Sequence, residues 1–194
     1  RQRQMCIRDS FPFVKVNCSA IPENLMESEF FGYEEGSFTG GVKGGKAGKF
    51  EKAHLGSMFL DEINAMSLKM QPKLLRALQE KEIERVGGTE SIPVNVRVLS
   101  ASNMPLDYLV EQGVFRRDLF YRLNIITVKI PPLRCRKEDI LPLTQSFIKR
   151  YNSELCRNVS GISDGALQYL TEYDWPGNVR ELQNVIERVI ASTW

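Results

Sequence analysis

The sequence has few of the residues that build metal centres and disulfide frameworks. Its 194 residues include one histidine and four cysteines, with no Cys-x-x-Cys pair. This pattern favours neither a zinc site nor a disulfide-stapled fold, and it is typical of a reducing compartment. No apolar run approaches the ~18 residues that a membrane helix needs, and charges stand where a signal peptide has its hydrophobic stretch. We therefore expect a cytoplasmic protein without a membrane anchor.

Neither sign of charge dominates the chain. Lysine and arginine number 26 against 24 acidic residues, a net charge of +2. This balance gives no electrostatic argument for binding nucleic acid or a membrane surface. Apolar residues make up 42% of the sequence, which is enough for the core of one domain with a small appendage. Residues 1–10 show no periodicity and partly resemble a translated sequencing adapter, so we expect a non-native or disordered leader.

The sequence also lacks the Gly-x-x-x-x-Gly-Lys-Ser/Thr string that cradles phosphates in many ATPases. The nearest glycine-lysine cluster, residues 40–49, has no hydroxyl residue after its lysines. Backbone amides around the phosphates and the lysine of that string supply much of the binding. We therefore expect this chain alone to bind ATP weakly and to hydrolyse it negligibly.

Strand and helix patterns alternate through the first two thirds of the chain. The predicted strands are residues 13–17, 57–60, 95–100 and 125–130. The predicted helices between them are residues 22–31, 67–81 and 105–123. This βαβ-like alternation favours an α/β fold with a doubly wound parallel sheet and helices on both faces.

Every periodic segment after the Pro-Pro joint at residues 131–132 is helical. The predicted helices are residues 140–152, 163–173 and 178–191. The last of them opens with Asn178 as a potential N-cap and Glu181 three residues later, as in a capping box. The segment therefore predicts a small helical lid that follows the sheet.

Two acids, Asp61 and Glu62, stand at the carboxyl end of the predicted strand 57–60. Nucleotides bind at this edge of open α/β sheets. The string GSMFLDE resembles a Walker B motif, which implies that Asp61 holds Mg²⁺ and that Glu62 orients the water that attacks the γ-phosphate. The alternative is a pair of carboxylates at a helix N-terminus, where the helix dipole favours them.

Glycines bracket a Phe-Thr tip in the string GSFTGG. Glycine frees the backbone and weakens helix propensity, so this phenylalanine is expected on a flexible loop rather than in a core. A helix C-cap followed by a turn is the alternative. The string resembles the GAFTGA loop of bacterial enhancer-binding proteins, the AAA+ activators that contact sigma-54. The residues of this loop are Gly36, Ser37, Phe38, Thr39, Gly40 and Gly41.

The resemblance to this family runs from about Phe11 to the C-terminus, with several motifs in the family's order. It implies an AAA+ P-loop NTPase-type α/β subdomain at residues 11–133, without its first strand and P-loop, and a helical lid at residues 134–194. Asn17 matches the asparagine that pairs with the Walker B glutamate. Ser102 and Asn103 match the sensor I position near the γ-phosphate. On their own, all three are also ordinary turn residues.

Three arginines match the family's phosphate-contacting positions. Arg116 and Arg122, in GVFRRDLFYRLN, stand where the family has arginines that reach the neighbouring protomer's nucleotide. Arg180, in WPGNVREL, matches the sensor II arginine of the lid. Guanidinium groups suit this role because they stay charged and can bind phosphate bidentately. Each could equally be a solvent-exposed charge, and Arg117 stands where the family usually has an acid.

The resemblance implies the central ATPase domain of a sigma-54-dependent transcriptional regulator, with ATP and Mg²⁺ as cofactors. Hydrolysis in a homo-oligomeric ring, a hexamer, would drive the loop against sigma-54 and remodel the closed promoter complex of the RNA polymerase holoenzyme. Promoter DNA would be reached through a DNA-binding domain outside this sequence. Two alternatives remain. One is a non-catalytic AAA-like interaction module, which the missing P-loop favours, and the other is an AAA+ ATPase that acts on another client.

Overall fold

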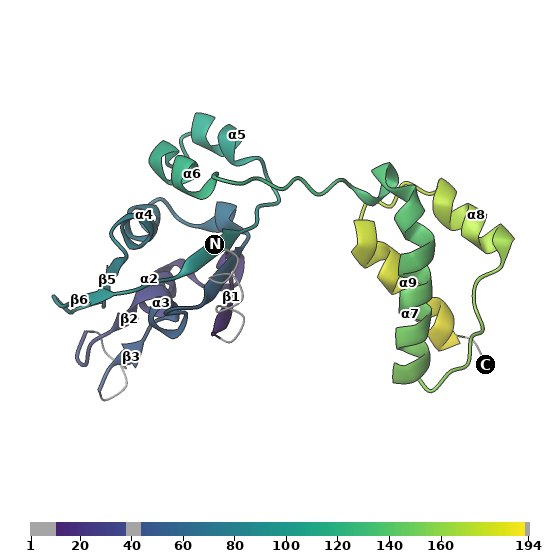
Figure 1. Ribbon diagram of the computed structural model, residues 1–194, viewed down its shortest axis with the longest axis horizontal. Helices are drawn as coiled ribbons and strands as arrows, with labels where there is room; N and C mark the ends of the chain where they lie inside the picture. Colours follow the sequence, from purple (N-terminus) through teal and green to yellow (C-terminus); the bar gives the residue numbers. More distant parts are fainter. Residues whose placement is uncertain (1–10, 38–43, 193–194) are drawn as a thin grey trace. The chain divides into compact units, whose positions relative to one another are not determined.

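The computed structural model describes residues 11–37 and 44–192 of the chain (Figure 1). The chain divides into two compact units, Arg1–Thr127 and Val128–Trp194. Residues 38–43, which include Phe38, Thr39, Gly40 and Gly41 of the glycine-bracketed loop, lie outside the described residues, as do residues 1–10. Within the described part, no helix has the length and apolar character that crossing a bilayer requires.

A three-stranded parallel sheet with the order β1-β4-β7 forms the centre of the first unit. The strands are β1 (Phe13–Asn17), β4 (Ser57–Asp61) and β7 (Arg97–Ser100). The central strand β4 is the most deeply buried, since Met58 and Leu60 have no exposed surface. The predicted parallel α/β sheet is confirmed, and its register places the ends of all three strands at one edge.

Three phenylalanines pack the helix before the loop against the helix after it. They come from α2 (Glu23–Phe31) and from α3 (Lys49–Lys52). The Phe31 and Phe50 rings stack with their centroids 5.6 Å apart, and Phe30 lies 6.4 Å from Phe50. All three are almost fully buried. Aromatic burial of this kind stabilises a small domain strongly, so the two ends of the loop start from a rigid base.

Two short antiparallel pairs were not predicted. β2 (Gly32–Tyr33) pairs with β3 (Lys46–Ala47), and β5 (Glu82–Glu84) pairs with β6 (Ser91–Pro93). Gly32 has φ +82, and a Cβ there would collide with the Lys46 carbonyl oxygen. Strands of two or three residues carry too little alternation to be recognised from sequence. The β2–β3 pair nonetheless encloses the glycine-bracketed loop.

The predicted continuous helix at residues 105–123 is wrong. The structure contains two helices, α5 (Leu106–Glu111) and α6 (Arg117–Leu123). Between them, Gly113 has φ +70, a left-handed conformation that ends a helix and that glycine adopts without strain. The break places Arg116 at the N-cap of α6 instead of inside a long helix.

The predicted strand at residues 125–130 is also wrong. Among the described residues no strand pairs with this segment, and its apolar side chains are exposed, Ile125 to 74% and Ile126 to 84%. A strand needs a neighbour to satisfy its backbone N–H and C=O groups. β-branched composition alone therefore does not make a strand here.

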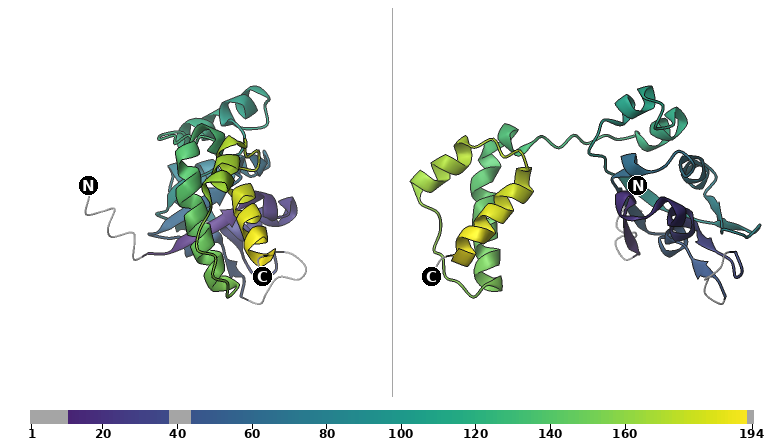
Figure 2. Two further views of the ribbon diagram at one scale, coloured as in Figure 1. Left: turned by 90° about the vertical axis from the view of Figure 1, so that its right-hand side faces the viewer. Right: turned by 180° about the vertical axis from the view of Figure 1, so that it is seen from behind.

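The second unit is helical, as predicted. Its main helices are α7 (Ile140–Glu154), α8 (Asp164–Glu172) and α9 (Asn178–Ser192), preceded by the 3-10 turns η4 (Leu133–Cys135) and η5 (Lys137–Asp139). Figure 2 shows α7 and α9 packed along each other. Their shared core includes Leu133, Ile140, Trp175, Leu182 and Ile190.

The predicted capping role of Asn178 is wrong in detail. Its Oδ1 accepts from the Leu133 N–H at 2.8 Å and so connects α9 to the turn before α7. The Glu181 carboxylate does bond backwards, but to the Gly177 N–H at 2.9 Å. The N–H that donates to Glu181 is therefore that of Gly177 and not that of Asn178, for which the capping box predicted this bond.

Candidate functional site

The carboxyl edge of the parallel sheet gathers polar residues from its strands. Asn17, the last residue of β1, lies opposite Asp61, the last residue of β4. Neighbouring strands are about 4.8 Å apart, so these two residues are adjacent. On the other side of β4, Ser100 lies opposite Leu60, and the Ala101 N–H donates to the Leu60 carbonyl at 2.9 Å. The edge predicted from the sequence therefore exists.

Glu62 is held in an uncommon backbone conformation at this edge. It has φ 51 and ψ 47, the left-handed region, although it is not a glycine. The turn lets the Ile63 N–H donate to the Ala101 carbonyl at 3.0 Å, and the Glu62 N–H donates to Asp61 Oδ1 at 3.0 Å. Such conformations are costly and cluster at active sites. The two acids are half-buried, so they remain accessible at the edge.

The buried thiol of Cys18 reports how close the acids lie to the end of β1. Cys18 is 1% exposed. Burial raises the pKa of its thiol to about 12, and the negative charges of Asp61 and Glu62 add to the effect. Charges influence a pKa in this way only at short range. The side chains that follow β1 and β4 therefore share one electrostatic environment.

The predicted phosphate-sensing pair lies just beyond β7. The Ser102 hydroxyl donates to the Met104 carbonyl at 2.6 Å and lies 3.1 Å from Asn64 Oδ1, in the turn after the acids. Ser102 is thus tied to the segment that follows Glu62. Asn103 is exposed beside it. This is the strand-end turn that the sequence also allowed, formed next to the acids.

The Asn17 side chain accepts its hydrogen bonds from a residue in the turn that follows β1. Its Oδ1 accepts from the Ser19 N–H at 2.9 Å and from the Ser19 hydroxyl at 2.8 Å. The side chain caps the short η2 turn (Cys18–Ala20). Among the described residues, no hydrogen bond joins Asn17 to Glu62, although Asn17 ends β1 and Glu62 directly follows the neighbouring strand β4.

The candidate arginines differ in how they are held. Arg116 forms a two-pronged ion pair with Asp118, with Nε to Oδ1 at 3.0 Å and Nη2 to Oδ2 at 2.7 Å. This pair lowers the pKa of Asp118 through the hydrogen bond from Arg116. Arg122 donates from Nη2 to the Leu78 carbonyl at 2.8 Å, at the end of α4 (Gln71–Gln79). Arg180 is exposed in the first turn of α9.

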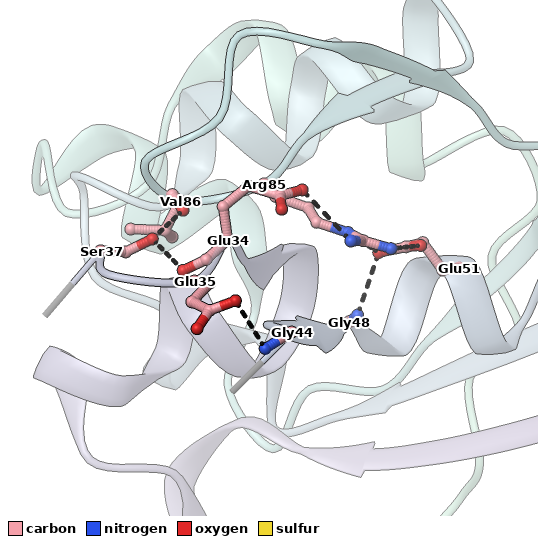
Figure 3. Close-up of polar contacts among 8 residues, drawn as sticks. All are labelled: Glu34, Glu35, Ser37, Gly44, Gly48, Glu51, Arg85 and Val86. Carbon is pink, nitrogen blue, oxygen red and sulfur yellow. Dashed lines mark hydrogen bonds and ion pairs between the residues drawn. The ribbon is translucent and has the colours of Figure 1, made fainter. Parts of the chain in front are cut away.

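A network of polar contacts surrounds the two ends of the glycine-bracketed loop (Figure 3). On the side that enters the loop, the Ser37 hydroxyl lies within hydrogen-bond distance of the Glu34 and Val86 carbonyl oxygens. On the side that leaves it, the Gly44 N–H donates to Glu35 Oε2 at 3.1 Å. A Cβ on Gly87 would collide with the Ser37 side chain. The base of the loop is therefore fastened to the turn between β5 and β6.

Arg85 is the centre of this network. Its Nε and Nη2 donate to the two carboxylate oxygens of Glu51 at 3.0 and 2.7 Å, and Nη1 donates to Glu34 at 3.2 Å. Burial alone would raise the pKa of Glu51, but the hydrogen bonds from Arg85 and from the Gly48 N–H outweigh it and lower this pKa below 4.5. The stability that Glu51 contributes is therefore present above about pH 4.5 and is lost as the pH falls through its folded pKa.

The sequence did not predict this network. Glu51 lies 34 positions before Arg85 in the chain, and neither residue belongs to a motif with a recognised spacing. Only the Gly87 and Gly88 turn after Arg85 was visible as a local signal. The pairing requires the tertiary structure that brings α3 to the β5–β6 turn.

Removing the Arg85 guanidinium should destabilise the first unit. Arg85→Met keeps the apolar stem but leaves the Glu51 carboxylate, 17% exposed, without its cation. Hydrogen bonds to charged groups support an expected loss of about 2 kcal/mol in the free energy of opening. Amide hydrogen exchange in β4 of the 194-residue chain measures it. The control is Arg76→Met, which removes two exposed ion pairs, with Glu80 and Glu84, and should cost far less. Equal losses in the two variants would contradict the prediction.

An α/β unit with acids at the carboxyl edge of a parallel sheet has the architecture of the nucleotide-binding α/β proteins, and here a helical unit follows it in the chain. Comparison with family models is specific. The sigma-54 interaction domain matches residues 3–129, and the AAA+ ATPase lid domain matches residues 134–193. The chain belongs to the family of sigma-54 interaction domains.

Curated proteins with similar sequences support this family assignment. The chain is 51% identical over 179 residues to the regulatory protein AtoC of Escherichia coli, covering 92% of the chain and 39% of AtoC. It is also 51% identical over 179 residues to the sigma54-dependent transcriptional activator SfnR of Pseudomonas putida, covering 92% of the chain and 49% of SfnR. The chain therefore spans less than half the length of each.

Solved structures confirm the fold. NtrX from Brucella abortus, in complex with ADP, superimposes with a TM-score of 0.86 at 38% identity, over 94% of this chain and 40% of NtrX. Hsp104 of Saccharomyces cerevisiae, in a complex with casein, superimposes with a TM-score of 0.66 at 17% identity over 91% of this chain and 34% of Hsp104, which shows a shared fold alone. The AAA+ fold expected from the sequence is confirmed.

Proposed function

We propose that this chain is the central ATPase domain, with an α/β subdomain at residues 11–133 and a lid at residues 134–194, of a cytoplasmic sigma-54-dependent transcriptional regulator. The longer protein of which it would be a part is called the parent protein below. In a ring of identical subunits, a hexamer, ATP hydrolysis would drive the loop of residues 36–41 against sigma-54 and remodel the closed promoter complex of the RNA polymerase holoenzyme. A DNA-binding domain outside this chain would bring the ring to the promoter.

The strained turn at Glu62 is the observation that carries the proposal. It stands at the carboxyl edge of a parallel sheet, directly after Asp61 and opposite the end of β1. Of the six non-glycine residues with positive φ among the described residues, Glu62 is the acid, and it stands at the carboxyl edge of the sheet. A catalytic carboxylate that must face a bound phosphate explains both the residue type and its conformation.

The acids fit a magnesium-nucleotide complex. Among the described residues no cluster of three or more His, Cys, Asp or Glu side chains forms a complete metal cage. Mg²⁺ does not require one, because it keeps several waters and binds through one or two carboxylates together with substrate phosphates. Asp61 would hold the ion and Glu62 would orient the attacking water. The ion, when bound, would neutralise charge on the phosphates.

The remaining residues would read the state of the nucleotide. Ser102 and Asn103 would contact the γ-phosphate from the end of β7, and Asn17 would exchange its bond to Ser19 for one to Glu62 as the nucleotide changes. Arg180 would bring the lid to the phosphates. Arg116 and Arg122 would reach the site of the neighbouring subunit, where their fixed charge stabilises the charge that develops during phosphoryl transfer.

The rigid base of the loop supports its use as a moving contact. Ser37 bonds the Glu34 and Val86 carbonyls, and the Gly44 N–H donates to Glu35, on either side of the tip. Arg85 in turn holds the Glu34 side chain. A displacement of the unit would therefore be passed to the tip instead of being absorbed at its ends. A non-catalytic interaction module could share this feature, but it has no need for the strained acid.

Thr39→Ala tests the loop assignment in the parent protein. We expect ATP turnover to stay within about twofold of wild type, because Thr39 is not among the residues proposed to contact nucleotide, while sigma-54 binding and open-complex formation fall at least about 10-fold. The measurements are a phosphate-release assay, a sigma-54 pull-down and transcription in vitro from a sigma-54 promoter.

The matched control is Thr171→Ala in α8, whose hydroxyl donates to the Leu167 carbonyl within its own helix. It should leave both turnover and sigma-54 binding close to wild type. Normal transcription by Thr39→Ala would remove sigma-54 as the target of the loop. Failure of the unmutated parent protein to bind sigma-54 in the pull-down would point to an AAA+ ATPase with a different client.

A further inference from the structure

Gln71 is a fully buried polar side chain outside every motif considered so far. It is the first residue of α4 and has no exposed surface. Burying an amide without hydrogen bonds is costly. Here the cost is avoided, because the side chain makes three bonds. Nε2 donates to the Met66 and Val114 carbonyl oxygens, both at 3.0 Å, and Oε1 accepts from the Arg116 N–H at 2.7 Å.

These partners fix the orientation of the amide. Two of them are carbonyl oxygens, which need a donor, and the third is an N–H, which needs an acceptor. Only one of the two amide orientations satisfies all three. A hydrophobic residue of the same size would leave the three backbone groups unpaired, and a shorter amide would not reach all of them. The position therefore demands the chemistry of glutamine.

The three partners belong to two different segments. Met66 lies in the turn that follows Glu62, after the short η3 helix (Ile63–Ala65). Val114 and Arg116 flank Phe115, which is 2% exposed, in the link between α5 and α6. Gln71 thus bonds the backbone on both sides of the buried Phe115, at Val114 and at Arg116.

The Arg116 backbone N–H needs a partner from outside its own helix. Arg116 is the N-cap residue of α6, where a helix supplies no partner for the N–H. Its guanidinium is held by Asp118 at the exposed surface. Gln71 fixes the Arg116 backbone and Asp118 fixes its side chain. Together they hold the charge in one place before any phosphate arrives, and such preorganisation is what a catalytic cation requires.

We propose that Gln71 is a positioning residue for ATP hydrolysis in the neighbouring subunit, and that it acts by fixing the backbone of Arg116. This inference rests on the proposed function, in which Arg116 works in trans. Gln71 itself contacts neither nucleotide nor metal. Its loss would leave the subunit's own acids intact and displace the arginine that the subunit offers to its neighbour.

Gln71→Met in the parent protein tests this inference, because methionine has nearly the same volume and none of the hydrogen bonds. We expect kcat to fall about 10- to 100-fold, as displacements of about 1 Å do, with KM and ATP binding within about twofold. Gln79→Met is the control, since it makes the same substitution at an exposed position of the same helix. It should be indistinguishable from wild type.

Mixed rings separate positioning in trans from a local effect on the acids. Gln71→Met subunits are combined with Glu62→Gln subunits, neither of which turns over ATP well alone. Where a Gln71→Met subunit holds nucleotide and a Glu62→Gln neighbour supplies Arg116, both halves of the site are intact. We expect turnover to recover to at least about 10-fold above the sum of the separate rings. An effect of Gln71 through Met66 on its own acids would give no recovery.

Arg116→Ala mixed with Glu62→Gln is the parallel test of the proposed function. No recovery in that mixture would remove the in-trans role of Arg116 itself. Recovery there, without recovery for Gln71→Met, would overturn the role of Gln71 alone. If Gln71→Met rings do not assemble, Gln71→Glu takes their place with the opposite expectation: it keeps an acceptor for the Arg116 N–H, so turnover should stay close to wild type, and a loss of about 10-fold or more in assembled rings would overturn the inference. Failure of both to assemble would make Gln71 a folding determinant and overturn the inference.

Discussion

Glu62→Gln in the parent protein should abolish ATP turnover while leaving nucleotide binding intact. Glutamine has the shape of glutamate but does not activate water, so removing a positioned base should lower kcat at least about 100-fold. The affinity for ATP and Mg²⁺ should stay within about threefold, because Asp61 remains and the amide is isosteric. A phosphate-release assay and titration with a fluorescent ATP analogue measure the two quantities.

Two companions sharpen the test of Glu62. Glu187→Gln makes the same change at an exposed position of α9 and should leave both quantities unchanged. Asp61→Asn should weaken Mg²⁺-dependent binding as well as turnover, since it removes the carboxylate proposed to hold the ion. Turnover that survives Glu62→Gln would remove Glu62 as the residue that orients the attacking water, whereas absence of turnover in the unmutated parent protein would favour the non-catalytic module. Binding and turnover lost together would show that Glu62 supports the fold of the edge.

The acid edge could be predicted because its signals are local. An alternating segment, residues 13–17, and an apolar segment, residues 57–60, identified two strands. The polar candidates are Asn17, the last residue of the first segment, and Asp61 and Glu62, which follow the second. Parallel pairing then places the ends of such strands at one edge. The structure adds what a pattern does not contain, the left-handed turn at Glu62 and the bond between Asn17 and Ser19.

The residues that support the site could not be predicted, because their partners are distant in sequence. Gln71 reaches Arg116 across 45 positions, and Arg85 reaches Glu51 across 34. In the sequence, a buried glutamine cannot be distinguished from an exposed polar residue at the start of a helix, and an arginine in a short hairpin cannot be distinguished from a surface charge. The segment 125–130 fails for the opposite reason. Its pattern is typical of a strand, but pairing is decided by neighbours and not by composition.

Arg116→Ala should lower turnover in the ring more than any other surface substitution considered. Arginines that act in trans on a transferring phosphoryl group contribute about 1,000-fold or more to kcat. The fold should be little affected, because among the described residues the Arg116 guanidinium pairs with Asp118 alone, at the exposed surface, and such pairs contribute little to stability. Phosphate release and thermal unfolding measure the two effects.

The adjacent Arg117 is the natural control, because it has the same charge and exposure one position away. Among the residues that the structure describes, Arg117 has no side-chain ion pair, whereas Arg116 is fixed through both its backbone and its guanidinium. Arg117→Ala should therefore keep near-wild-type turnover. Arg122→Ala should lower turnover and stability together, since its Nη2 also bonds the Leu78 carbonyl at the end of α4. A large loss for Arg117→Ala with none for Arg116→Ala would mean that Arg116 is structural and that Arg117 reaches the phosphate.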